Sequence, residues 1–165
     1  MRDGAATKER IGRTALRLFV EKGMAETTIR DIAAGAGVAE GTMYRHYASK
    51  DELAADLYLG NLAAFAEELG ALSLRHGSLA ARNDAMIRLF CAFFDRDPTL
   101  FAYLLLSRGA EHQKLASGQR HPMDAVRETI EAGMEAGEIP RRDSGVMAAM
   151  SFGLVREVAM ARLEG

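Results

Sequence analysis

Residues 27–53 read TTIRDIAAGAGVAEGTMYRHYASKDEL, and this stretch decides how the N-terminal part of the chain folds. Thr27 or Thr28 is placed to cap a short helix, and Gly37 is placed to turn the chain after it. A second short helix is predicted from about Ala39 to Tyr47. Two short helices joined by a three-residue turn have the spacing of a helix-turn-helix.

The sequence on either side of this stretch predicts two longer helices. Residues 7–22 carry an apolar stripe at helical spacing, and Gly23 is placed to end that helix. Ser49 and Glu52 have the spacing of a capping box, which predicts a long helix from Lys50 to about Leu74. The stripe consists of Ile11, Ala15, Leu18 and Phe19.

The remainder of the chain also has helical periodicity. Asp97-Pro98, Pro122 and Asp143 are start signals, and a break is predicted at residues 76–78. No stretch alternates apolar and polar residues as a strand does. We therefore predict an all-α fold in two parts, residues 1–50 and 51–165, with the boundary near the start of the fourth helix. The further helices are predicted at about 78–95, 98–106 with a continuation towards Leu115, 122–136 and 144–163.

Composition and charge describe a globular protein with an uneven charge distribution. Of the 165 residues, 48% are hydrophobic and 27% charged, which excludes a disordered chain. No apolar run is long enough to cross a bilayer, the N-terminus lacks a secretory signal, and one cysteine fits a reducing cytoplasm. Residues 1–50 have a net charge of +3 and residues 51–165 a net charge of −5. A basic head on an acidic body suits a protein that meets phosphate at one end.

The predicted helix at residues 39–47 presents polar side chains of the kind that read DNA bases. Glu40, Thr42, Tyr44 and Arg45 are expected on its outward side, and Gly41 would let the backbone approach DNA closely. Phosphate contacts are predicted from Tyr44, His46, Lys50 and the backbone amides at Thr28. Three-helix units also occur as purely structural modules, and Met43 and Tyr47 are expected in the core.

The segment at residues 7–57 resembles the DNA-binding domain of the tetracycline-repressor (TetR) family of regulators. Phe19, Gly23, Thr28, Ile32-Ala33, Gly37-Val38, Gly41-Thr42, Tyr44, Tyr47, Lys50 and Leu53 carry this resemblance. The family often has a polar or basic residue where Ala39 and Glu40 stand, so the resemblance implies an operator that is read differently. The implied DNA contacts are Thr28, Ala39, Glu40, Gly41, Thr42, Tyr44, His46 and Lys50.

The resemblance implies that residues 51–165 form a helical domain that dimerises and encloses a pocket for an apolar or aromatic small ligand. Aromatic and methionine side chains are the candidates for the wall, because such groups line pockets. Each of them could equally belong to the core. Arg88, Tyr103 and His112 are candidate polar contacts. The candidate pocket residues are Phe65, Met86, Phe90, Phe93, Phe94, Phe101, Tyr103, Met123, Met150 and Phe152.

The helix predicted at the C-terminal end of the sequence is apolar on several sides, as in a helix that is buried or lies in an interface. Val146, Met150, Leu154 and Val158 form one stripe with Met147, and we expect this helix to pair two copies of the chain. The family often has one further helix. Either this is a short member or the sequence omits a tail.

No enzymatic, metal or cofactor motif is found in the sequence. The four histidines have no acidic or thiol partner at metal-ligand spacing, and Cys91 lies in an apolar helix. We therefore expect a cytoplasmic homodimeric repressor without a cofactor, which a ligand releases from double-stranded operator DNA. Two alternatives remain open, a ligand-binding scaffold whose head no longer binds DNA and an α-helical enzyme.

Overall fold

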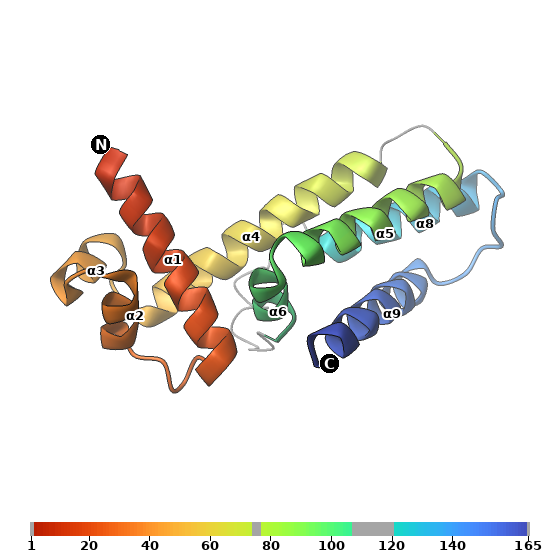
Figure 1. Ribbon diagram of the computed structural model, residues 1–165. Coiled ribbons are helices and arrows are strands. Elements are labelled where there is room, and N and C mark those ends of the chain that lie inside the picture. Colours follow the sequence, from red (N-terminus) through yellow and green to blue (C-terminus); the bar gives the residue numbers. More distant parts are fainter. Residues whose placement is uncertain (1, 74–76, 107–120, 165) are drawn as a thin grey trace. The chain divides into compact units, whose positions relative to one another are not determined.

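The computed structural model describes residues 2–73, 77–106 and 121–164, and every regular element in these ranges is a helix (Figure 1). The all-α prediction is therefore confirmed. The predicted continuation towards Leu115, with His112, lies outside the described residues, as do Leu74 and His76. The helices are α1 (Arg2–Lys22), α2 (Ile29–Ala36), α3 (Glu40–His46), α4 (Lys50–Ser73), α5 (Leu79–Arg96), α6 (Pro98–Leu106), α8 (Pro122–Glu135) and α9 (Ser144–Glu164).

Several helix starts are capped as the sequence predicts. The Asp97 carboxylate accepts from the Leu100 amide at 2.9 Å, and the Asp143 carboxylate accepts from the Val146 amide at the same distance. α8 begins at Pro122 as predicted, but its cap residue was not predicted: the side chain of His121 accepts a hydrogen bond from the Met123 amide, and burial lowers the pKa of this histidine. These interactions join residues two or three positions apart, so sequence spacing identifies most of them.

Two helix starts differ from the prediction in detail. α1 begins at Arg2 rather than near residue 7. At the start of α4, the Glu52 amide donates to the Ser49 hydroxyl at 3.0 Å, as a capping box requires. The Glu52 carboxylate, however, accepts from the amide of Ala48 and not from that of Ser49.

The first of two compact units comprises residues up to Gly60 together with the segment that begins at Ala102. Its core consists of buried aliphatic side chains from α1, α2 and the start of α4. Tyr103 belongs to this unit, where its ring stacks on Phe19 and its hydroxyl donates to the Ala54 carbonyl at 2.9 Å. Among the most deeply buried side chains are Ile11, Ile32, Met43 and Leu53.

The second unit comprises residues 61–101 and the C-terminal segment with α8 and α9. Its core is aromatic. The ring of Phe65 stacks on that of Phe93, with 4.6 Å between the ring centroids, and meets the ring of Phe90 edge-on, with 4.8 Å between the centroids. The division between the compact units falls within α4, after Gly60, while the predicted functional boundary at residue 50 stays a prediction.

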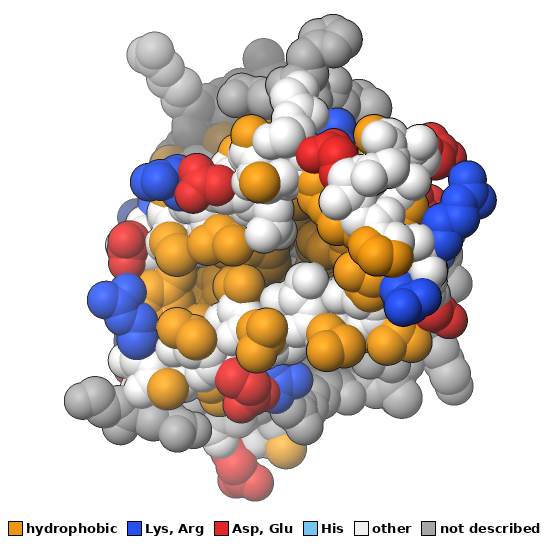
Figure 2. Space-filling view, turned by 90° about the vertical axis from the view of Figure 1, so that its right-hand side faces the viewer, with side chains coloured by type: hydrophobic (Ala, Val, Ile, Leu, Met, Phe, Trp, Pro, Cys, Tyr) orange, Lys and Arg blue, Asp and Glu red, His pale blue; other side chains and the backbone are white. Residues whose placement is uncertain are grey.

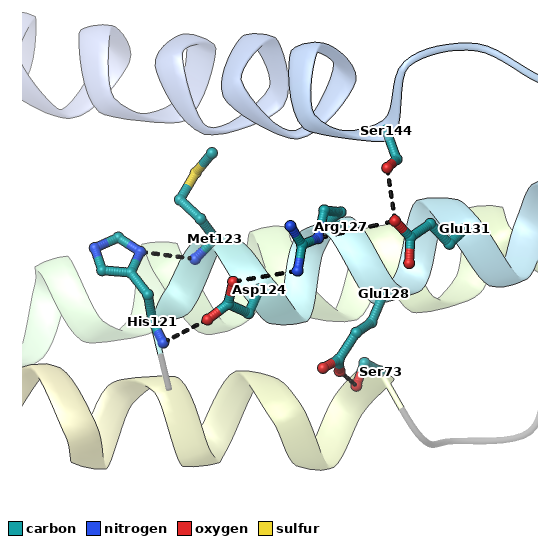
Figure 3. A network of polar contacts seen from close by, with 8 residues as sticks. All are labelled: Ser73, His121, Met123, Asp124, Arg127, Glu128, Glu131 and Ser144. Atoms are coloured by element: carbon teal, nitrogen blue, oxygen red, sulfur yellow. Dashed lines mark hydrogen bonds and ion pairs between the residues drawn. The ribbon is translucent and has the colours of Figure 1, made fainter. Parts of the chain in front are cut away.

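A chain of polar contacts ties α8 to the helices on either side of it (Figure 3). Glu131 accepts a hydrogen bond from the hydroxyl of Ser144 at the start of α9, and Glu128 accepts one from Ser73 at the end of α4. Arg127 lies between Asp124 and Glu131 and pairs with both. These contacts fix α8 within the second unit.

The described part of the chain contains no helix that is both long and apolar enough to cross a membrane. The same part contains no group of three or more histidine, cysteine or acidic residues that could hold a metal ion.

Candidate nucleic-acid interface and apolar slot

The turn between α2 and α3 is built from backbone contacts that glycine makes possible. Gly37 has φ +64°, a left-handed conformation in which glycine has no steric cost. Its amide donates to the Ala34 carbonyl, and the next amide, of Val38, donates back to Ala33 at 3.0 Å. α3 then begins after Ala39, whose carbonyl accepts from the Thr42 amide at 2.8 Å. The predicted helix-turn-helix geometry is therefore present.

The start of α2 is closed by a complete capping box between Thr28 and Asp31. The Thr28 hydroxyl accepts from the Asp31 amide at 3.1 Å, and the Asp31 carboxylate accepts from the Thr28 amide at 3.0 Å. The Thr28 hydroxyl also donates to the Asp31 carboxylate at 2.9 Å, and the two bonds that this carboxylate accepts from Thr28 hold the pKa of Asp31 below its usual value. Thr28 is exposed, whereas the neighbouring Thr27 is buried and donates to carbonyls of Leu18 and Gly23.

The outward face of α3 offers a short, accessible surface. Tyr44 is 58% exposed, which makes it the most exposed aromatic side chain among the described residues. Glu40 and Gly41 are exposed next to it, as is the preceding cap residue Ala39. Thr42 is half-buried, and its hydroxyl accepts a hydrogen bond from Arg45 at 3.1 Å.

One basic residue at this surface was not among the predicted contacts. Arg30, in the first turn of α2, has an exposed side chain that lies 3.9 Å from the carboxylate of Glu40. This exposed pair spans the N-terminal turns of α2 and α3. The signal in the sequence is an arginine two residues after the cap residue Thr28.

The inward face of α3 is anchored by Met43 and Tyr47, which are 0% and 4% exposed, so their predicted place in the core is confirmed. The Tyr47 hydroxyl donates to Asp56 on α4 at 3.0 Å, and Lys8 of α1 pairs with the same carboxylate. Burial, with Asp56 adding to it, raises the pKa of Tyr47 far above its usual value. α3 is therefore anchored on its inner face while its other face stays accessible.

Lys50, predicted to contact phosphate, is bonded to backbone carbonyls in this structure. Its ammonium donates to the carbonyls of Met24 at 2.7 Å and Thr27 at 2.8 Å, with a longer contact to Ala25 at 3.5 Å. A lysine ammonium has three donors, so these carbonyls can use all of them. The geometry gives Lys50 a positioning role between α4 and the α1–α2 turn, and a phosphate contact stays a prediction. His46 is half-buried at the end of α3.

Two apolar cavities lie next to each other between α5 and α9 in the second unit. The larger, of about 220 Å³, also reaches α6, and the smaller, of about 160 Å³, also reaches α8. They share the four wall residues Ile87, Phe90, Leu154 and Val155, so we call the two together the apolar slot.

Half of the predicted pocket residues line this slot. Met86, Phe90, Phe94, Phe101 and Phe152 belong to its walls. The other five do not line it. Phe65 and Phe93 are buried against other rings, Tyr103 belongs to the first unit, Met123 is half-buried at the start of α8, and Met150 is 65% exposed.

The aliphatic part of the slot wall was missing from the predicted pocket, and two of its residues, Leu154 and Val158, were predicted for the dimer stripe instead. Leu154, Val155 and Val158 of α9 face Ile87 and Cys91 of α5 across it. Arg88, a predicted polar contact, instead pairs with Asp84 on the exposed side of α5 at 2.8 Å. Helical spacing alone could have suggested the α9 residues, because they repeat every three to four positions.

Comparison with known proteins identifies the N-terminal segment. Residues 11–57 match the family described as "Bacterial regulatory proteins, tetR family". The chain is 46% identical over 56 residues to the uncharacterized HTH-type transcriptional regulator YerO of Bacillus subtilis, and the match covers 32% of this chain and 19% of YerO. It is 48% identical over 48 residues to the HTH-type transcriptional repressor KstR2 of Mycobacterium tuberculosis, which covers 29% and 24% of the two chains. The matches thus span a quarter or less of these relatives.

The fold as a whole is similar to that of solved regulators. The structure of the fatty acid degradation regulator FadR from Bacillus halodurans superposes with a TM-score of 0.82 at 19% identity, over 96% of this chain and 84% of that one. At this identity the likeness shows the fold alone. The helix-turn-helix geometry and the sequence match together show that residues 11–57 form the segment that defines the tetR family of bacterial regulatory proteins.

Proposed function

We propose that this chain is a homodimeric DNA-binding transcription regulator, a repressor that a small apolar ligand releases from its operator. The observation that carries the proposal is α3, a short helix whose inner face is buried by Met43 and Tyr47 while Tyr44 on its outer face is 58% exposed. A rigid helix with an accessible polar face is what insertion into the major groove requires.

In this proposal α3 is the recognition helix. Thr42 and Glu40 would contact base edges, and Gly41 would let the backbone come close, because a Cβ there meets nothing within 4 Å on the protein side. Tyr44 and His46 would contact the phosphate backbone, with the amides at Thr28 adding the positive end of the α2 dipole. Ala39 would pack against the DNA, and Arg30 and Lys50 add positive charge nearby.

The outer face of α9 supports a homodimer. Val146, Met150, Leu154 and Val158 recur every four residues and are 57–71% exposed, so they form one uncovered aliphatic stripe. Leu154 and Val158 also border the apolar slot, so the stripe and the slot meet along this edge of α9. Figure 2 shows hydrophobic side chains gathered across the middle of one face of the molecule with charged side chains towards its edges. Two copies paired through such stripes would bury them around a two-fold axis. A dimer of this kind would place two α3 helices in successive major grooves, about 34–36 Å apart.

The apolar slot in the second unit supports a ligand-response function. A ligand that binds more tightly to the conformation with poor DNA affinity would release the operator, and typical couplings of this kind are about 1–3 kcal/mol. α4 is the candidate for transmitting the change, because this one helix contributes residues to both compact units. Such a regulator would act in the cytoplasm, where it has access to operator DNA.

The test is selection of bound sequences from a random pool of DNA duplexes at near-physiological salt, followed by affinity measurements on the enriched site. We expect an inverted repeat to be enriched. Tyr44→Ala should lower affinity for that site by at least tenfold, and Thr42→Ala should relax the base preference in each half-site. Arg13→Ala is the matched control, because Arg13 is an exposed arginine of α1 that pairs only with Glu9 among the described residues.

The outcome also separates the two alternative functions. A scaffold with an inactive head would enrich no sequence and would be indifferent to Tyr44→Ala. An α-helical enzyme would turn over a substrate in a screen, for which the described residues offer no acid–base pair at the slot. Enrichment without an inverted repeat would contradict the dimer.

A further inference from the structure

The apolar slot has the shape of a channel that follows two helices. On α5 its wall residues run from Asn83 to Phe94, and on α9 they run from Ser151 to Arg162. The end residues of each set lie eleven positions apart, and residue numbers rise along both helices in the same direction from the smaller cavity to the larger one. Figure 1 shows α5 and α9 running in this same sense. The slot is therefore long and narrow, bounded by two parallel helices.

The length of the slot sets the length of its ligand. Eleven residues of α-helix extend about 16 Å. A fully extended chain advances about 1.2 Å per bond, since three backbone bonds span about 3.3–3.6 Å. A straight chain of about 12 to 14 atoms would therefore run from one end of the slot to the other.

The chemistry of the slot changes along its length. Its middle is formed by Ile87, Phe90, Leu154 and Val155, which lie in both cavities and are all apolar. The end at the larger cavity carries one cation, Arg162, whose side chain is exposed. In the part of the chain that the structure describes, Arg162 forms no ion pair, and no slot residue carries a carboxylate.

We infer that the slot binds a straight-chain carboxylate of about 12 to 14 carbons, with the alkyl chain between α5 and α9 and the carboxylate at Arg162. The apolar walls take the chain because burial of each methylene is favourable. A guanidinium is well suited to a carboxylate, with which it can form two parallel hydrogen bonds. The opposite end, at Asn83 and Ser151, is neutral, so the polarity of the slot fixes the direction in which the chain enters. This inference rests on the proposed function, in which the second unit binds the ligand.

The experiment compares a carboxylate with the alcohol of the same chain length by titration calorimetry on the full chain. Sodium dodecanoate should bind more tightly than 1-dodecanol, and affinity in the carboxylate series should rise about fourfold per methylene from octanoate and level off near 12 to 14 carbons. Arg162→Gln should lower the affinity for dodecanoate about threefold to tenfold and leave the affinity for dodecanol unchanged. Arg88→Gln, which removes an exposed arginine outside the slot, is the matched control.

A second variant tests the location. Cys91 lies on the slot wall and is exposed, so Cys91→Phe fills the slot without entering the packed core, and it should weaken both dodecanoate and dodecanol. Equal affinity of the wild-type chain for acid and alcohol would overturn the inference, as would equal effects of the two arginine variants or no binding of either probe. The proposed DNA-binding function is tested separately, by operator selection with ligand-free protein, so its failure can be told apart from failure of the slot proposal. Dodecanoate that binds at Arg162 but leaves operator affinity unchanged would refute ligand release while upholding the slot.

Discussion

Replacing Lys50 by methionine removes the ammonium that joins the start of α4 to the α1–α2 turn. The stem of the side chain is kept, so the change isolates the hydrogen bonds to the carbonyls of Met24 and Thr27, at 2.7 and 2.8 Å. Both carbonyls lie in the segment that joins α1 to α2. We expect the variant to be less stable than the wild-type chain.

The size of the effect follows from the two short contacts. Hydrogen bonds to charged groups contribute about 1.5–3 kcal/mol when buried. Lys50 is half-buried, so water can replace part of each bond, and we expect a loss of about 2 kcal/mol in the free energy of unfolding. For a chain of 165 residues this corresponds to a fall in Tm of roughly 4–8 °C.

The assay is urea unfolding of Lys50→Met beside Lys8→Met. Lys8 is the matched control, because its pair with Asp56 is about half exposed and surface pairs contribute less than about 1 kcal/mol. The salt dependence of operator binding is measured on the same proteins. A Lys50→Met variant as stable as the wild type, with a salt slope lowered by about one, would refute the positioning role and establish the phosphate contact.

Three further predictions concern two glycines of the helix-turn-helix, the dimer and acid stability. Gly41→Ala should raise the free energy of unfolding by about 0.5–1 kcal/mol, since a Cβ at this helical glycine meets open space, and it should lower operator affinity. Gly37→Ala should lower the free energy of unfolding by about 1 kcal/mol, because Gly37 has φ +64°. Urea titration measures both changes in stability. Met150→Glu should shift the chain from dimer to monomer in sedimentation equilibrium, because two copies of the charge would be buried at the interface, and an unchanged dimer would refute the role of α9. Asp31 has a pKa below its usual value in the folded chain, so its stabilisation is present above the usual aspartate pKa and is lost as the pH falls through the lowered value; Asp31→Asn should flatten the fall in urea midpoint between about pH 5 and pH 2.

The features that sequence reasoning predicted well are those that depend on neighbouring residues. The capping of α2 by Thr28 joins residues three positions apart, and the left-handed turn at Gly37 depends on the absence of a side chain at one position. The burial of Met43 and Tyr47 follows from their spacing on a single helix face. Such interactions are determined by local spacing and residue type, so they can be predicted from the sequence.

The ligand slot was predicted less well, because an aromatic side chain can pack against another ring or line a cavity. Phe90 and Phe93 lie three positions apart on α5, yet Phe90 lines the slot while Phe93 stacks on Phe65 and does not. The direction in which each ring points depends on how α5 meets α6, α8 and α9. That arrangement joins segments far apart in the chain, and no local pattern encodes it.

The sequence by itself determined the all-α fold, the helix-turn-helix and the family resemblance of the N-terminal segment, because caps, glycine turns and apolar periodicity act over a few residues. Only the tertiary structure decided what Lys50 and Arg162 do. Lys50 meets carbonyls more than twenty positions away, and Arg162 ends a slot whose opposite wall lies on α5. Both roles arise from long-range packing, which brings together groups whose separation in the chain gives no sign of their contact.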